Sequence, residues 1–338
     1  MWPTLAGALL LVLLVQSVPV AVAPAGALLM VGLAYANGAN DLSKGIATLV
    51  GAEVADYRRA IRWGVAWTGL GAVAAVALAS TLTATFSASF LLGASAYGER
   101  EAFAALLGGL VWLLLATRTA LPVSTTHAIA GAIVGVGLAN GGFAIDWLEI
   151  GKKIALPLAA SPFIAVALGI GVFKLTHMLP RQISLGNSLH WLSAAGVSFA
   201  RGTNDAPKII GLGAAFAVAH QGATIPLWVY IVIALAMATG SWLGSRRVTT
   251  TLAERVTRLD EQEGLSANLT TATIVSAASI WGLPVSTTHL SSSAIIGAGA
   301  RRGKDAVRWR TVWEITSAWL TTAPVSTGLA IIFYLAIA

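Results

Sequence analysis

Two short polar motifs, each present twice, are the parts of this chain best suited to chemistry. Residues 121–127 have the sequence Leu-Pro-Val-Ser-Thr-Thr-His, and residues 283–289 repeat it 162 positions later. A proline interrupts a helix, the Ser-Thr-Thr run starts a new one, and the amides and dipole of a helix N-terminus bind phosphate-like anions. The pattern therefore predicts an anion site. Its hydroxyl donors come from both copies: Ser124, Thr125, Thr126, Ser286, Thr287 and Thr288.

The second motif places a carboxylate inside an apolar segment. Residues 36–41 have the sequence Ala-Asn-Gly-Ala-Asn-Asp, and residues 200–205 have Ala-Arg-Gly-Thr-Asn-Asp, 164 positions later. A charge at the bilayer centre costs about 2.5–3.5 kcal/mol, so each carboxylate needs compensation. We expect a helix break in both copies, whose freed carbonyls, with Asn and Asp oxygens, hold a cation. The candidate residues are Asn37, Asn40, Asp41, Thr203, Asn204 and Asp205, and the sodium ligands, if the ion is sodium, are Asn40, Asp41, Asn204 and Asp205.

Each motif also has an ordinary structural interpretation. A single Gly-Ala-Asn-Asp is usually a turn, and a single Pro-x-Ser-Thr-Thr is usually a plain N-cap. Because both occur in both halves of one membrane chain, we favour the functional interpretation. Other residues keep two alternatives. His127 and His289 either relay a proton or contact the substrate, or they bond a neighbouring carbonyl. Lys44 and Lys208 either attract anions or extend towards water.

Composition indicates the environment that these motifs occupy. Of 338 residues, 57% are hydrophobic and 10% are charged, and the mean hydropathy is +0.79. A soluble domain carries about 25% charged residues, and stretches such as 60–86 and 225–244 are long enough to cross a bilayer. The basic residues behind the net charge of +7 lie in short loops, which argues against nucleic acid as a partner. The chain is predicted to be an all-α polytopic membrane protein embedded in the lipid bilayer. It has no cysteine, hence no disulfide or thiolate metal site.

The repeated motifs indicate an internal duplication. Trp147 and Pro162 recur as Trp309 and Pro324, again 162 positions later. We predict a first repeat at 25–175, a cytoplasmic linker at 176–188, a second repeat at 189–338, and an extra N-terminal transmembrane helix at 1–24. The crossings in the first repeat are expected at 27–51, 61–85, 101–118, 121–139 and 151–174. Those in the second repeat are expected at 189–215, 223–245, 265–281, 284–300 and 310–336. The total is about 11 transmembrane segments.

An odd number of crossings in each repeat predicts that the two copies have inverted topology, and the loop charges agree. Alternate loops collect fourteen basic residues on one side, against Arg100, Lys152 and Lys153 on the other. By the positive-inside rule the richer side is cytoplasmic. We therefore expect a cell (inner or plasma) membrane protein with a cytoplasmic N-terminus and an external C-terminus. Inverted repeats with broken helices are typical of transporters whose site lies at the bilayer midplane.

Together the doubled motifs resemble those of the inorganic phosphate transporter family, over nearly the whole chain from about Ala25. The resemblance implies symport of inorganic phosphate with sodium or protons, through a site shared by the repeats. Some similar proteins move sulfate, so sulfate is the alternative substrate. Arg201, the counterpart of Asn37, departs from the histidine that family members often have. This fixed cation is a further substrate-binding candidate, because it could compensate charge, alter the coupling ion or favour another oxyanion.

We therefore expect secondary active import of inorganic phosphate by alternating access, with no cofactor other than the coupling ion. A homodimer is one assembly to consider. The alternative from another class is an intramembrane hydrolase using Asp41, Asp205, His127 and His289 as acid–base groups. Duplication of each group at near-equal spacing argues against an enzyme, because catalysis usually needs different groups in different roles. A passive anion channel is a third alternative.

Overall fold

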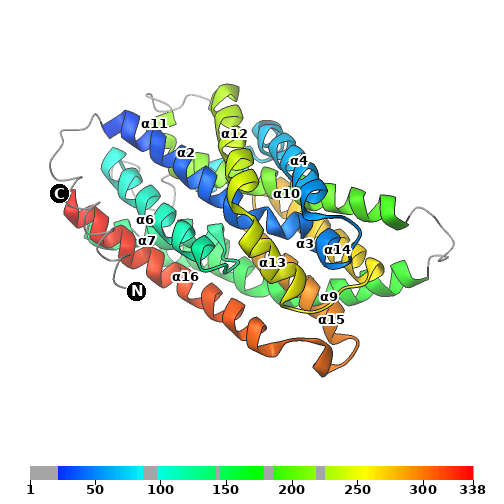
Figure 1. Ribbon diagram of the computed structural model, residues 1–338. Helices are drawn as coiled ribbons and strands as arrows, with labels where there is room; N and C mark the ends of the chain where they lie inside the picture. Colours follow the sequence, from blue (N-terminus) through cyan, green and yellow to red (C-terminus); the bar gives the residue numbers. More distant parts are fainter. Residues whose placement is uncertain (1–21, 87–96, 142–144, 179–185, 218–224, 338) are drawn as a thin grey trace.

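The computed structural model describes residues 22–86, 97–141, 145–178, 186–217 and 225–337, and these form a bundle of long helices (Figure 1). No strand is present in these ranges apart from an isolated bridge between Thr257 and Val307. The helices of the first half are α2 (Val22–Asp41), α3 (Ser43–Gly51), α4 (Tyr57–Leu78), α5 (Ser80–Thr85), α6 (Glu99–Arg118), α7 (Thr125–Ala139), α8 (Trp147–Ile150) and α9 (Leu156–His177), with a π-helical turn at Gly151–Ala155. Those of the second half are α10 (Gly186–Leu212), α11 (Ala214–Ala217), α12 (Leu227–Gly244), α13 (Arg246–Glu254), α14 (Glu261–Ile280), α15 (Thr287–Ala300) and α16 (Trp309–Ala336), with a 3₁₀ turn at Lys304–Ala306.

The prediction of a multi-pass helical membrane protein is confirmed. In the described part of the chain, five helices are long and apolar enough to cross a membrane: α4, α6, α9, α12 and α16. Within the crossings predicted at 121–139 and 284–300, residues 121–124 and 284–286 are not helical, as expected for helices that start at the Ser-Thr-Thr runs. The helices α7 and α15 that follow have 15 and 14 residues. At 1.5 Å per residue they are about 20 Å long, which is shorter than a hydrocarbon core of about 30 Å. Two predicted segments lie largely outside the described residues. They are the N-terminal helix at 1–24, of which 1–21 are not described, and the linker at 176–188, of which 179–185 are not described.

Of the two predicted helix breaks, only the first is present. The helix α2 ends at Asp41 and α3 begins at Ser43. At this one-residue interruption the hydroxyl of Ser43 donates to the Asn40 carbonyl at 2.9 Å. In the second copy α10 continues through Asn204 and Asp205 to Leu212, so the break predicted there is wrong. Its sequence has Pro207 at the position of Ser43, and α10 continues there although a proline has no N–H for the helical ladder.

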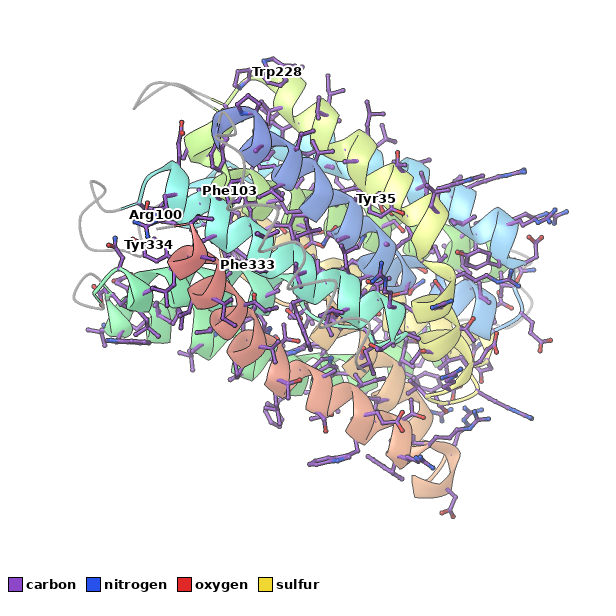
Figure 2. All side chains as sticks on the ribbon, turned by 60° about the vertical axis from the view of Figure 1, so that its left-hand side comes forward. Tyr35, Arg100, Phe103, Trp228, Phe333 and Tyr334 are labelled. Carbon is purple, nitrogen blue, oxygen red and sulfur yellow. The ribbon has the colours of Figure 1, made fainter. Side chains whose placement is uncertain are left out.

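Helices from the two predicted repeats pack crosswise (Figure 1). The first helix of each copy lies against the second helix of the other, α2 on α12 and α10 on α4, and α4 also packs on α12. The last helices extend the pattern, because α16 packs on α6 and α7, while α9 packs on α14 and α15. One of these crossings ends where the Arg100 guanidinium lies 4.1 Å above the Tyr334 ring (Figure 2). In each of these pairs, a helix of one half therefore contacts a helix of the other half.

The glycines of the doubled motif are needed where these helices cross. A Cβ added at Gly38 would lie 2.0 Å from the carbonyl oxygen of Met237 in α12. A Cβ added at Gly202 would lie 2.3 Å from the carbonyl oxygen of Thr68 in α4. Both residues are inside helices, so close approach of two backbones, rather than a break, explains why glycine is required.

We expect Gly38→Ala to destabilise the protein, because the carbonyl it would strike belongs to a helix backbone that cannot yield locally. The cost should be about 1–3 kcal/mol or more, the range for overpacked cores. Thermal unfolding in detergent measures it. Gly69→Ala in α4 is the matched control, because no atom lies within 4 Å of its added Cβ. Equal unfolding temperatures for the two variants would contradict the proposed role of Gly38.

Several loops meet at one end of the bundle, which we call the arginine-rich end. Gly51 packs against the backbone of Ala253, and Arg302 donates to the carbonyl of Arg258. The arginines that these loops and the adjoining helix ends carry are Arg58, Arg59, Arg62, Arg246, Arg247, Arg255, Arg258, Arg301, Arg302, Arg308 and Arg310.

Candidate functional site

The N-termini of α7 and α15 lie side by side and are tied to each other. Thr126 donates from Oγ1 to the carbonyl of Val285 at 3.0 Å, and Thr288 donates to the carbonyl of Val123 at 2.6 Å. The extended segments before the helices therefore hold each other in place through equivalent residues. Both helices are capped as predicted. The hydroxyls of Ser124 and Ser286 accept from the amides of His127 and His289 at 3.2 and 3.1 Å.

The carboxylate of Asp41 lies between these two helix ends. Its Oδ2 atom accepts from the hydroxyl of Thr125 at 3.5 Å and from that of Thr287 at 3.4 Å. Its other oxygen, Oδ1, pairs with the ammonium of Lys44. One residue of the first motif thus contacts both copies of the second motif, and its oxygen competes for hydroxyls that were predicted to hold an anion.

The side chain of Asn37 links the residues around Asp41 to the second half of the chain. Its Nδ2 atom donates to Thr125 Oγ1 at 2.9 Å and to Asp205 Oδ2 at 3.2 Å. Its Oδ1 atom accepts from Arg201 at 3.3 Å. The two aspartates predicted to share one site are therefore joined through Thr125 and Asn37, and Asn37 meets its own repeat counterpart, Arg201.

Asn40 and Asn204 mainly anchor neighbouring segments. Asn40 donates to Thr117 Oγ1 at 3.1 Å and accepts from the backbone amide of Val123 at 3.1 Å. Asn204 donates to Ser279 Oγ at 2.9 Å, at the position equivalent to Thr117. Thr203 is turned back onto its own helix, where its hydroxyl donates to the Ala200 carbonyl at 2.8 Å. Among the described residues, Thr203, Ser124 and Ser286 each form hydrogen bonds only within their own helix or cap, and none of them bonds another predicted site residue.

Lys44 and Lys208 complete the site, and the sequence alone does not decide between their two predicted roles. Both side chains are fully buried, so the interpretation that they extend towards water is wrong. Each ammonium is surrounded by oxygens of equivalent residues. Lys44 pairs with Asp41 and donates to Asn40 Oδ1 at 3.2 Å, and Lys208 pairs with Asp205 at 3.4 Å and donates to Asn204 Oδ1. The signal in the sequence was their spacing, three residues after each aspartate on a helix. The oxygens predicted for sodium therefore face a fixed cation of the chain itself.

The centre of the protein carries more positive than negative charge. Lys44, Arg201 and Lys208 face only two carboxylates, Asp41 and Asp205, and none of the five is more than 1% exposed. Their net formal charge is +1. Within the described residues, Arg201 Nε and Nη2 have no hydrogen-bond partner. A buried charge without compensation is unfavourable, so this arrangement is suited to receive an anion.

The two histidines of the doubled motif stack on each other. The ring centroids of His127 and His289 are 4.6 Å apart, and His289 also lies 4.2 Å from the Trp319 ring. His127 Nδ1 is 2.8 Å from Ser124 Oγ. In the described part of the chain, no hydrogen bond joins either imidazole to Asp41 or Asp205, so the acid–base pairs that a hydrolase would need are not formed.

The fold defines a multi-pass membrane protein, and its centre holds buried side chains with a net positive formal charge. The chain belongs to the phosphate transporter family, whose model matches residues 37–191 and 180–330. This membership confirms the resemblance seen in the motifs. The family consists of transporters, so the interpretation as an intramembrane hydrolase is wrong.

Individual relatives match this chain over nearly their full length. A probable low-affinity inorganic phosphate transporter of Bacillus subtilis is 32% identical over 310 residues, which cover 89% of this chain and 92% of the relative. A protein of the same description from Rhizobium meliloti is 31% identical over 314 residues, covering 89% and 92%. A solved structure, described as the sodium-dependent phosphate transporter, superposes with a TM-score of 0.83 at 23% identity and covers 93% of this chain and 98% of that one. At that identity the likeness supports the fold.

Proposed function

We propose that this chain imports inorganic phosphate by cation symport, with alternating access to the site between α7 and α15. The observation that carries the proposal is the buried centre, where a net formal charge of +1 lies beside two helix N-termini. Helix N-termini bind oxyanions through their amides, and a guanidinium with free N–H groups binds them through paired charge-assisted bonds. Arg201 supplies those groups from α10.

Phosphate fits the carboxylates of this site better than sulfate does. Near neutral pH phosphate carries at least one hydroxyl, which can donate to Asp205. Sulfate is fully deprotonated and offers only acceptors, so its oxygens would meet the carboxylate oxygens without a proton between them. A site with both donors and carboxylate acceptors therefore favours phosphate.

Coupling arises because phosphate and Asp41 use the same hydroxyls. Thr125 and Thr287 both donate to Asp41 Oδ2, so an incoming oxyanion competes with that carboxylate for them. Two neighbouring anions repel, and the repulsion favours protonation of the carboxylate when phosphate binds. Binding of the anion and uptake of a proton then support each other.

The lysines favour a proton over sodium as the coupling ion. A sodium ion held by Asp41 or Asp205 would lie next to the ammonium of Lys44 or Lys208, which already contacts those oxygens. A co-transported cation is needed in either case, because a negative interior opposes anion entry by about 2.3 kcal/mol per charge per 100 mV.

The membrane arrangement follows the same proposal. We infer that the arginine-rich end faces the cytoplasm of a cell membrane, in accordance with the positive-inside rule. The exchanged contacts of α2 with α12 and of α10 with α4 support two inverted copies related by a pseudo-two-fold axis. The count of about 11 segments, the external C-terminus and a homodimer remain parts of this proposal.

Uptake of labelled phosphate into proteoliposomes tests the function. We expect accumulation above the external concentration when the lumen is made alkaline, and no accumulation with a sodium gradient alone. A tenfold excess of sulfate should reduce uptake by less than about twofold. Sulfate has no hydroxyl to donate, so its binding would leave a buried carboxylate oxygen without a partner. Equilibration without accumulation would instead indicate a passive channel, and dependence on the sodium gradient would overturn the assignment of the proton.

A further inference from the structure

A group of polar side chains extends from the centre towards the arginine-rich end. Thr48 in α3 donates to Asn268 Oδ1 in α14 at 2.9 Å, and Asn268 donates to Ser193 Oγ in α10 at 3.2 Å. Ser193 in turn donates to the carbonyl of His190 at 2.8 Å. We call Thr48, Asn268, Ser193 and His190 the polar cluster. All four are buried.

The inner end of the polar cluster begins at the central site. Thr48 lies one helical turn beyond Lys44 in α3. The carbonyl of Lys44, at the same turn, accepts from the hydroxyl of Ser291 in α15 at 3.3 Å. Thr48, which bonds Asn268 of α14, therefore lies one helical turn from the ion pair of Lys44 and Asp41.

The outer end of the polar cluster reaches exposed arginines. His190 packs against Gly264, where an added Cβ would lie 2.5 Å from its Cε1 atom. The preceding residue, Glu263, is 3.2 Å from Arg302 and 3.7 Å from Arg301, and those arginine side chains are 36% and 43% exposed. The cluster thus connects the centre with the surface that carries most of the basic residues.

Helix packing does not explain the imidazole of His190. Hydrogen bonds between helices are a sufficient structural reason for Thr48, Asn268 and Ser193. Neither ring nitrogen of His190 has a hydrogen-bond partner among the described residues, although the side chain is 0% exposed. A buried polar group without a partner is unfavourable, unless water or a ligand reaches it at some stage.

The other copy of the repeat has apolar residues at the equivalent positions. Thr48, Asn268, Ser193 and His190 correspond to Leu212, Leu106, Leu29 and Gly26. The three leucines belong to, or pack against, one apolar cluster of the core. The space beside Gly26 is filled by the Phe216 ring, 2.4 Å from an added Cβ. The duplication would have placed the same residue types on both sides, so the polar cluster is specific to the direction of the arginine-rich end.

We propose that the junction of α3, α10 and α14 is the pathway by which phosphate and water move between the central site and the arginine-rich end, with His190 donating to the passing oxyanion. The inference rests on the proposed function. Neutral donors lower the barrier for an anion without trapping it, and the arginines beyond raise its local concentration. In the described conformation the junction is closed, and it opens when the site faces that end.

The chain has no cysteine, so single cysteines can report access to water directly. We would place them at Thr48, Ser193 and Asn268, with matched controls at Leu212, Leu29 and Leu106, in sealed membrane vesicles of known orientation. A membrane-impermeant thiol reagent added at the arginine-rich side should label the first three at least about tenfold faster than the controls, because thiol reactivity follows exposure. Saturating phosphate should slow that labelling.

Ser193→Cys changes one hydroxyl to a thiol and should leave the fold intact, so its result decides the test. Failure of Ser193→Cys to react above Leu29→Cys would overturn the pathway. Labelling that phosphate does not slow would leave a water-filled junction but remove phosphate from it. Absence of phosphate uptake in the cysteine-free chain would instead contradict the proposed function, which makes the two failures distinguishable.

A second measurement addresses His190 itself. His190→Leu should reduce phosphate uptake about tenfold, the effect of one lost donor at the barrier, with central phosphate binding in detergent unchanged. His190→Gln keeps an N–H donor and should restore most of the rate. Equal loss in both variants, or none in either, would remove His190 from the pathway.

Discussion

Asp41→Asn should abolish phosphate uptake, and additional replacement of Lys44 should restore the fold without restoring transport. The single change raises the net formal charge of the centre from +1 to +2 and leaves the Lys44 ammonium buried without its carboxylate. Breaking a buried ion pair in this way costs about 3–5 kcal/mol. We expect a lower unfolding temperature and uptake reduced by roughly 100-fold or more, since the residue is proposed to carry the proton.

The double variant Asp41→Asn with Lys44→Met separates the two effects. It removes one charge of each sign, so the net charge of the centre returns to +1 and no ammonium is left unpaired. The unfolding temperature should recover while uptake stays absent. If uptake recovers with the fold, Asp41 serves only as the counter-ion of Lys44 and the proposed coupling is wrong. Asp205→Asn with Lys208→Met is the comparison in the other copy.

Arg201→Asn should weaken phosphate binding and at the same time stabilise the protein without phosphate. The change restores the residue of the first copy, Asn37, and removes the excess positive charge of the buried centre. Losing charge-assisted bonds to an anion costs about 1.5–3 kcal/mol, which corresponds to roughly 10–100-fold in affinity. Removing an uncompensated buried charge acts in the opposite sense on stability.

Calorimetric phosphate binding and thermal unfolding of the phosphate-free protein measure both effects. Arg201→Lys keeps the charge but loses the planar pair of donors, and it should retain part of the affinity. A variant Arg201→Asn that unfolds more easily and binds phosphate normally would show that the guanidinium only anchors Asn37.

Local chemistry made much of this site predictable. A serine followed by two threonines after a proline specifies an N-cap wherever it occurs, and both helices begin where that rule places them, one residue after Ser124 and Ser286. Recurrence of the motifs showed that the two helix starts would be equivalent. Composition was sufficient for the membrane class, because a chain with so few charges has no surface for water.

The wrong or missing predictions concern features that the motifs alone do not show. The same Asn-Asp pair ends a helix in one copy and lies inside a continuous helix in the other, although the second copy has a proline at position 207. The role of Lys44 and Lys208 was not predictable, because burial and partners are tertiary properties. Their spacing alone does not favour an ion pair over extension to water. The polar cluster required three helices, α3, α10 and α14, to be placed together.

The crosswise packing of the copies has a consequence for how such a protein can move. At Gly38 and Gly202 the backbones of α2 and α12, and of α10 and α4, approach too closely for even one added methyl group. Sliding either copy as a unit past the other would have to separate both crossings. In the alternating access that we propose, the bodies that shift would therefore be mixed assemblies, with α2, α4, α10 and α12 as a shared frame.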